Sequence, residues 1–280
     1  MAGYRDIEGF IRPRRGLKIL VLDTNNIQFY YQNVHLLPPE YIFKPYYDMV
    51  IIPGWVHSEY AHHEGKSAYI SSLPLPIFIV EESEDYLPML GYSDKRLMEL
   101  FRVSSLLGES QQFFNRLRRL EMEDFPDDWI DQFYEYGFPT KQSGNLVTKK
   151  NAGEVSILAL TMCLLSHYRS QISNISIASS DYGIVRLKQK VLKEANASPL
   201  ELGISNAPPI SYLTTDVSLF NAFKTRLIQP HQVSSLRPNP KSSQYIELFN
   251  DGTSALHEHV LDTTTFLAIC QNHEKYKILF

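Results

Sequence analysis

The sequence has only two cysteines among its 280 residues, Cys163 and Cys270. Two isolated cysteines provide neither a disulfide framework nor the spacing of a zinc site. The sequence is therefore neither a disulfide-rich protein nor a cysteine-zinc protein. No apolar run approaches the roughly 20 residues that a membrane span requires. The first residues mix charged with aromatic side chains and show no secretory pattern, so we expect a cytoplasmic protein without membrane contact.

The chain also lacks an excess of positive charge. Its 27 Lys and Arg residues stand against 31 Asp and Glu residues, for a net charge of −4. This balance excludes a protein that coats nucleic acid through its overall charge, and any such contact must come from a local basic patch. Hydrophobic residues make up 44% of the chain, which is ample for a packed core.

What the sequence does contain is a set of continuous apolar runs, which predict strands of a parallel sheet covered on both faces. These runs are Leu17–Leu22, Met49–Ile52, Ile172–Ala178 and Ile210–Leu213. A fifth run, Ile77–Val80, follows Pro74 and Pro76 and suits an edge strand. The helical stretches between the runs include Trp55–Ser71 and Glu154–Tyr168. We therefore expect a three-layer α/β/α fold with a mostly parallel central sheet.

Changes in pattern along the chain predict its organisation. Helical periodicity dominates between Ser93 and Tyr136, and a polar, lysine-bearing loop from Thr140 to Lys150 follows it. Prolines and serines after residue 228 indicate a linker, and Asn250-Asp251-Gly252 indicates a hairpin turn. We expect an N-terminal segment (1–16), an α/β domain (17–228) with a helical insertion (about 92–150), a linker (229–244) and a small α+β appendage (245–280).

Four acidic residues near the ends of these apolar runs are candidate metal ligands. Asp23 ends the first run, Glu59 follows the second, Glu154 opens a long apolar helix, and Asp181 ends the strand that closes with Ser179 and Ser180. The carboxyl ends of parallel strands meet at one edge of a sheet, so these carboxylates are expected to converge. Hard oxygen ligands of this kind suit Mg²⁺ or Mn²⁺.

Each of these acids also has a structural explanation. Asp23 and Asp181 could cap the helices that follow them, and Glu59 could be a solvated helix residue. Asn151 and Glu154 have the spacing of a capping box. Asp216 is a fifth and weaker candidate, because it stands where a helix begins.

The four contexts together resemble a PIN domain. They are the Leu22-Asp23-Thr24-Asn25 start, the Ile-Pro-Gly-x-Val-x-x-Glu segment from Ile52 to Glu59, the Gly-Glu-x-Ser helix from Gly153 to Ser156, and Ser179-Ser180-Asp181, in the usual order of the family. The resemblance implies that Asp23, Glu59, Glu154 and Asp181 bind one or two divalent ions and are catalytic. It also implies that Thr24, Asn25 and Ser180 support the site through polar contacts. The long spacing between Glu59 and Glu154 and the single acid at Asp181 depart from compact members of the family.

The activity that the resemblance implies is hydrolysis of RNA by a metal-dependent endoribonuclease that leaves a 5′-phosphate and a 3′-hydroxyl. Exposed cations would have to hold the RNA backbone, and the candidates are Arg116, Arg118, Arg119, Lys149 and Lys150. Tyr30, Tyr31 or Trp55 is available to stack on a base. A toxin, a defence nuclease and an RNA-maturation enzyme would share this pattern, with a homodimer mate and an antitoxin-like inhibitor as further partners.

Two other functions remain open. A flap-type structure-specific DNA nuclease shares the metal chemistry. It would use a helical insertion as an arch over the DNA strand that it cuts. A catalytically inactive PIN fold could instead act as a binding module, although all four acids are present.

Overall fold

The computed structural model describes residues 3–105, 108–120, 126–143, 146–181 and 209–280, together with 183–185, 188, 189, 191 and 193. Within these residues, no helix has both the length and the apolar character needed to cross a membrane. The helices up to the centre of the chain are α1 (Tyr4–Ile11), α2 (Thr24–Gln32), α3 (Pro39–Ile42), α4 (Gly54–Tyr60), α5 (Glu64–Ser71) and α6 (Glu82–Met89). Those that follow are α7 (Asp94–Ser105), α8 (Gly108–Leu117), α9 (Trp129–Tyr136), α10 (Ala152–His167), α12 (Thr215–Lys224), α13 (Pro230–Leu236) and α14 (Thr263–Gln271).

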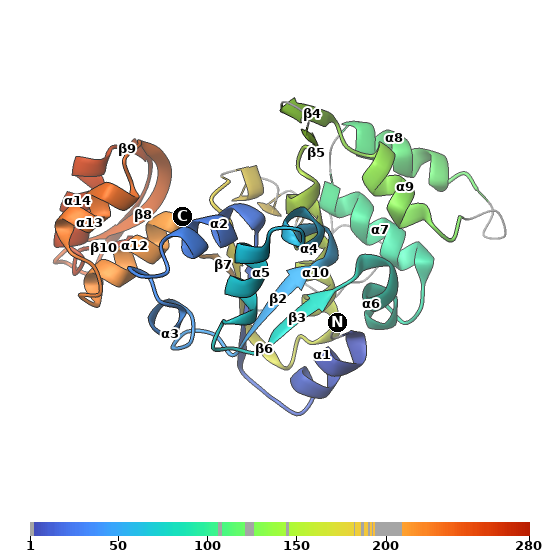
Figure 1. The fold of residues 1–280 in the computed structure, drawn as a ribbon, viewed down its shortest axis with the longest axis horizontal. Helices are drawn as coiled ribbons and strands as arrows, with labels where there is room; N and C mark the ends of the chain where they lie inside the picture. The colour runs from blue at the N-terminus through green and yellow to red at the C-terminus, as the bar shows by residue number, and fades with distance from the viewer. Residues whose placement is uncertain are drawn as a thin grey trace.

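A five-stranded parallel sheet forms the centre of the molecule, with helices on both of its faces (Figure 1). Its strands are β1 (Leu17–Leu22), β2 (Met49–Pro53), β3 (Ile77–Val80), β6 (Ile172–Ala178) and β7 (Ile210–Tyr212). Their order across the sheet is β3-β2-β1-β6-β7, so β3 is at an edge, as the flanking prolines predict. The predicted strands and the α/β class are thereby confirmed.

Helix α10 is buried because it is apolar on almost every side. It packs against β1, β2 and β6 on one side and against α4, α6 and α7 on the other. Its only residues that are not fully covered lie at its two ends, and they include Glu154. The helix therefore fixes the position of Glu154 relative to the sheet.

The helices α7, α8 and α9 form a lobe beside the sheet (Figure 1) and enclose an aromatic core. The ring of Phe133 lies 4.8 Å from that of Phe114 and 5.7 Å from that of Phe101. The segment 140–150, predicted to be an irregular loop, instead contains an antiparallel hairpin of β4 (Thr140–Ser143) and β5 (Leu146–Lys149). Its sequence has few apolar residues in alternation, so strand pairing there was not visible in the pattern.

A second difference from the sequence prediction concerns the stretch after β2. The predicted single helix Trp55–Ser71 is two helices, α4 and α5, which are separated at residues 61–63. The His63 side chain accepts a hydrogen bond from the Lys66 amide (3.3 Å) and so caps α5. Gly65 stands just after the break but within α5, and the polar cap that starts this helix is supplied by a histidine rather than by a common capping residue.

The C-terminal part of the chain forms a three-stranded antiparallel sheet of β8 (Lys241–Leu248), β9 (Ser254–Leu261) and β10 (Tyr276–Ile278), in the order β10-β8-β9. The predicted hairpin about Asn250-Asp251-Gly252 is confirmed. The segment 229–244, predicted to be a linker, contains α13 and the start of β8. Its serines and prolines are absorbed into a helix that begins with Pro230 and into a paired strand.

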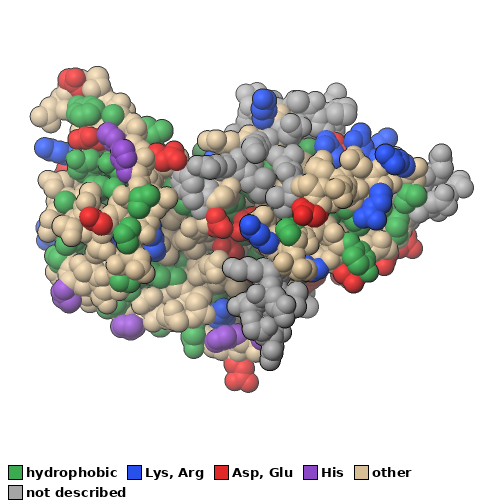
Figure 2. Space-filling view, turned by 90° about the horizontal axis from the view of Figure 1, so that it is seen from above, with side chains coloured by type: hydrophobic (Ala, Val, Ile, Leu, Met, Phe, Trp, Pro, Cys, Tyr) green, Lys and Arg blue, Asp and Glu red, His purple; other side chains and the backbone are tan. Residues whose placement is uncertain are grey.

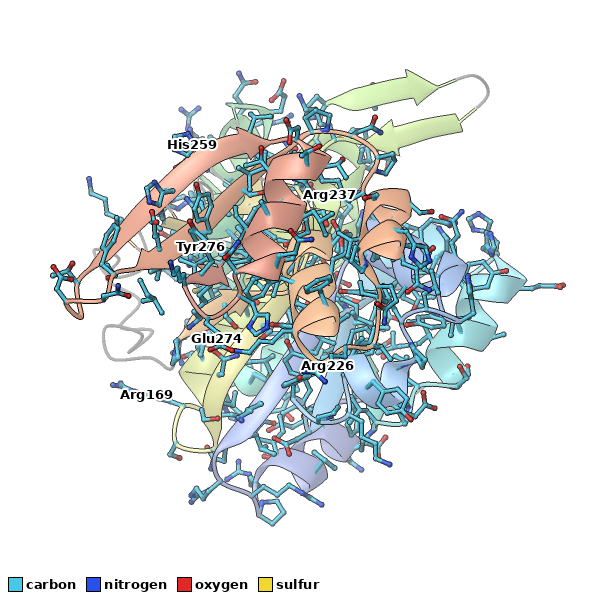
Figure 3. The ribbon with its side chains drawn as sticks, turned by 90° about the vertical axis from the view of Figure 1, so that its left-hand side faces the viewer. Arg169, Arg226, Arg237, His259, Glu274 and Tyr276 are labelled. Atoms are coloured by element: carbon cyan, nitrogen blue, oxygen red, sulfur yellow. The ribbon has the colours of Figure 1, made fainter. Side chains whose placement is uncertain are left out.

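A buried ion pair joins this C-terminal part to α12. The Arg237 guanidinium, at the end of α13 (Figure 3), donates to both carboxylate oxygens of Asp216 at 2.9 and 3.1 Å. The Ser243 hydroxyl donates to the same carboxylate at 2.7 Å, and Arg237 also donates to the Leu261 carbonyl at 3.0 Å. Asp216 is therefore a structural partner of Arg237, which removes it from the candidate metal ligands.

We predict that Asp216→Asn lowers the free energy of unfolding by about 3–5 kcal/mol, because it leaves the buried Arg237 charge uncompensated. Denaturant unfolding followed by circular dichroism measures this change. Asp6→Asn, at an exposed aspartate of α1, is the matched control and should have almost no effect. A loss below about 1 kcal/mol for Asp216→Asn would show that this pair is not a principal support of the fold.

Candidate active site

The candidate site lies where the strand order of the sheet changes direction. From β1 the chain places β2 and β3 on one side, and later places β6 and β7 on the other. Asp23 follows the carboxyl end of β1, Asp181 follows that of the adjacent β6, and the Asp23 amide donates to the Ala178 carbonyl at 3.1 Å. In open α/β sheets a crevice forms at such a switch point, so the topology brings these two acids to a position suited to ligand binding.

Asp23 is the most deeply buried of the four acids, at 7% exposure. The Ser179 hydroxyl donates to its Oδ2 at 3.2 Å. Burial, together with the nearby charges of Glu154 and Glu59, raises the pKa of Asp23 to about 7. The site therefore holds a carboxyl group that is partly protonated near neutral pH, because placing several negative charges together in a buried region is unfavourable.

Glu59 reaches the same region from α4. Its carboxylate accepts hydrogen bonds from the Thr24 hydroxyl and, at 3.1 Å, from the Trp55 indole nitrogen. Gly153 faces both acids: a Cβ built on it would lie 3.8 Å from Glu59 Oε1 and 3.9 Å from Asp23 Oδ1. Glycine at this position thus leaves the space between the two carboxylates open.

Glu154 and Asp181 complete the group. Burial raises the pKa of Glu154, and the charges of Asp181 and Glu59 raise it further. The capping-box alternative is not formed, because Asn151 adopts a left-handed backbone (φ +65°) and makes no side-chain cap. Asp181 is exposed and accepts a hydrogen bond from the Gly183 amide at 2.7 Å. All four predicted acids are therefore within electrostatic reach of at least one other.

The predicted supporting residues are only partly as expected. Thr24 contacts Glu59, but Asn25 is exposed, and the buried amide is that of its neighbour Asn26. Asn26 donates to the Leu213 carbonyl at 3.0 Å and accepts from the Ser180 hydroxyl at 3.1 Å, so it ties α2 to the ends of β6 and β7. Sequence reasoning missed Asn26 because two asparagines stand side by side and the pattern does not say which one faces inward.

Trp55 links the acids to the helical lobe. Its ring stacks on Tyr134 of α9, with ring centres 4.3 Å apart and planes 6° from parallel. The Tyr134 hydroxyl donates to Glu82 at 3.3 Å, and the Trp55 amide and the Ser156 hydroxyl donate to the same carboxylate. One face of the Trp55 ring is thus already covered by Tyr134. The role of Trp55 in stacking on a base stays a prediction, and its indole donates to Glu59.

The donor set has the chemistry of a divalent-ion site without its closed geometry. Within the described ranges, no group of three or more His, Cys, Asp or Glu side chains is arranged to hold a metal ion. In the same part of the chain, no Lys, Arg or His forms an ion pair with Asp23, Glu59, Glu154 or Asp181. The carboxylates therefore share one region and repel one another, with their charge uncompensated by any described cation.

Basic side chains gather beside this region rather than in it. Figure 2 looks from above onto the end of the sheet toward which β2 points in Figure 1. Acidic side chains lie near the centre of this view, and Lys and Arg side chains gather over the helical lobe. Arg116, Arg118 and Arg119, in and just after α8, are exposed, as is Lys150. The Lys149 ammonium donates to the Glu135 carbonyl and lines a cavity of about 390 Å³ beside Trp55. Three arginines and Lys150 thus remain accessible to an anionic ligand.

Comparison of the chain with protein-family models, with curated proteins and with solved structures found no match. The class of protein must therefore be inferred from the sheet topology and the acidic site.

We predict that the metal-free protein loses stability as the pH rises from about 4 to 7. In this window Asp23 is protonated in the folded state and ionised in the unfolded state, so the folded state binds more protons and loses stability as the pH rises. The raised pKa of Asp23 can lower the free energy of unfolding by at most about 4 kcal/mol across this window. Thermal unfolding in chelator at pH 5 and pH 8 measures it. The loss of stability between pH 5 and pH 8 should be smaller in Asp23→Asn than in wild type or in Asp6→Asn. Equal losses in all three proteins would contradict the raised pKa of Asp23.

Proposed function

We propose that the protein is a PIN-like, Mg²⁺- or Mn²⁺-dependent endoribonuclease that uses Asp23, Glu59, Glu154 and Asp181. The observation that carries the proposal is the convergence of these acids, from four separate segments, at the switch point of a parallel sheet. A purely structural role is hard to explain for Asp23, because a buried carboxylate is normally paired with a cation or fully hydrogen-bonded.

The residues present suit a divalent ion in two respects. They offer only oxygen ligands, which Mg²⁺ and Mn²⁺ prefer. Their charge lacks a compensating cation among the described side chains. A bound ion would offset the burial and the mutual repulsion that raise the pKa values of Asp23 and Glu154.

Three of the acids are held by the fold in positions from which they could bind the ion. Asp23, at the end of β1, would bind it as the ionised carboxylate. Glu59 is held in place by Thr24 and Trp55, and Glu154 by the N-terminal turn of α10. When bound, the ion would polarise the scissile phosphate and supply a hydroxide nucleophile at neutral pH.

We propose RNA as the substrate because of the resemblance to the PIN family, since phosphate contacts alone would hold RNA and DNA alike. The exposed Arg116, Arg118 and Arg119 on the helical lobe can contact backbone phosphates while the strand to be cut lies over the acids. Hydrolysis by this class would leave a 5′-phosphate and a 3′-hydroxyl. A toxin, a defence nuclease and an RNA-maturation enzyme are all compatible with this proposal, as are a homodimer and an antitoxin-like inhibitor as partners.

The first test measures cleavage of labelled tRNA, total RNA and single-stranded DNA in Mg²⁺, in Mn²⁺ and in chelator. We expect metal-dependent RNA cleavage that falls at least about 100-fold in Asp23→Asn and in Glu154→Gln, because each variant removes a charged ligand without changing shape. Asp6→Asn should cleave like wild type.

Three outcomes separate the alternatives. Loss of cleavage together with loss of Mn²⁺ binding in calorimetry supports the assigned ligands. Cleavage of DNA alone would identify a flap-type nuclease, with the lobe of α7, α8 and α9 as its arch. Absence of cleavage and of Mn²⁺ binding in the wild type would leave a PIN-like binding module.

A second test addresses Trp55 as a positioning residue. Trp55→Phe keeps a ring against Tyr134 but removes the indole donor to Glu59, so we expect Mn²⁺ affinity and kcat to fall about 10- to 100-fold with little change in melting temperature. Tyr134→Phe keeps the stacking and leaves Glu59 untouched, and is the matched control. Equal metal affinity in Trp55→Phe and wild type would show that the indole does not orient Glu59.

A further inference from the structure

A cavity of about 410 Å³ lies on one face of the sheet, between β6, β7 and α12. It is bordered by Lys18 of β1, by Asn174 and Ser176 of β6, and by Ser211 of β7. None of Asp23, Glu59, Glu154 and Asp181 borders it. The cavity is therefore separate from the candidate active site.

The floor of this cavity is polar where a parallel sheet is normally apolar. In the strand register, Lys18 pairs with Asn174 and Ser176 pairs with Ser211, so these side chains share one face. The Asn174 amide donates to both serine hydroxyls at 2.9 and 3.0 Å, and the hydroxyls lie 2.8 Å apart. Small polar residues at these positions leave the cavity unfilled at a cost in packing, which is typical of a functional site.

The rim of the cavity carries aromatic and cationic groups. Tyr41 and Tyr46 are 63% and 42% exposed, which is unusually open for rings of this size. Lys18 and Lys277 are also exposed, and within the described residues neither ammonium group has an ion pair. The rim thus offers flat rings for stacking and two free positive charges for an anion.

We propose that this cavity binds a nucleoside monophosphate. A base would stack on the rim tyrosines, the phosphate would contact Lys18 and Lys277, and the sugar hydroxyls would meet the amide and hydroxyls of the floor. The cavity volume lies within the usual range for small-molecule sites. Two lysines disfavour a neutral sugar, and the aromatic rim distinguishes the site from one for a simple phosphate. This inference goes beyond the proposed nuclease activity and does not depend on it.

The test is calorimetric titration of the full chain, in chelator, with AMP, GMP, CMP and UMP. Adenosine, ribose 5-phosphate and inorganic phosphate serve as comparison ligands. We expect at least one nucleotide to bind at least tenfold more tightly than each of the three. The double variant Lys18→Gln with Lys277→Gln should weaken that binding at least tenfold, whereas Lys275→Gln, at an exposed lysine outside the cavity, should not.

Two further variants test whether the nucleotide binds in the cavity or at the four acids. Ser211→Leu should abolish binding by filling the cavity, provided that its circular dichroism matches wild type; the lysine variants decide the question if it does not fold. Asp23→Asn should bind the nucleotide as wild type does, whether or not the nuclease proposal holds.

Three results would overturn the proposal. They are no nucleotide binding up to about 1 mM, equal binding of a nucleotide and ribose 5-phosphate, and a loss of binding in Asp23→Asn but not in the lysine variant.

Discussion

The reversal of strand order between β1 and β6 is the constraint from which the rest of the site follows. Because neighbouring connections leave the sheet in opposite directions there, no single helix can cover the carboxyl ends of both strands. The acids at these ends are held by the sheet itself, and Glu59 and Glu154 approach from helices that pack on it. The fold brings the four negative charges together, and the hydrogen bonds from Thr24, Trp55 and Ser179 restrict how far they can move apart.

Much of this arrangement could be predicted from the sequence, for a simple reason. Strands buried on both faces must be continuously apolar, so β1 and β6 were located to the residue. The acids that follow these strands are Asp23 and Asp181. Glu59 and Glu154 were found from the four short motifs that resemble a PIN domain. The hairpin of β8 and β9 was equally visible, because Asn250-Asp251-Gly252 has the chemistry of a tight turn.

What could not be predicted depends on contacts between distant segments. The pairing of β4 with β5 has little apolar alternation to indicate it, and the choice of Asn26 over Asn25 depends on where β7 ends. The contact of Trp55 with Tyr134 joins residues far apart in sequence. Asp216 looked like a further ligand until Arg237 and Ser243 were seen to enclose it. In each case the local pattern was compatible with several environments, and only tertiary packing selected one.

The buried pair of Asp216 and Arg237 has a consequence for the modularity of the chain. A protein shortened to its α/β part would keep Asp216 but lose both Arg237 and Ser243, the two side chains of the described residues that donate hydrogen bonds to its carboxylate. The C-terminal sheet is therefore not a detachable accessory, because without it the α/β part would contain a carboxylate that has lost its ion pair.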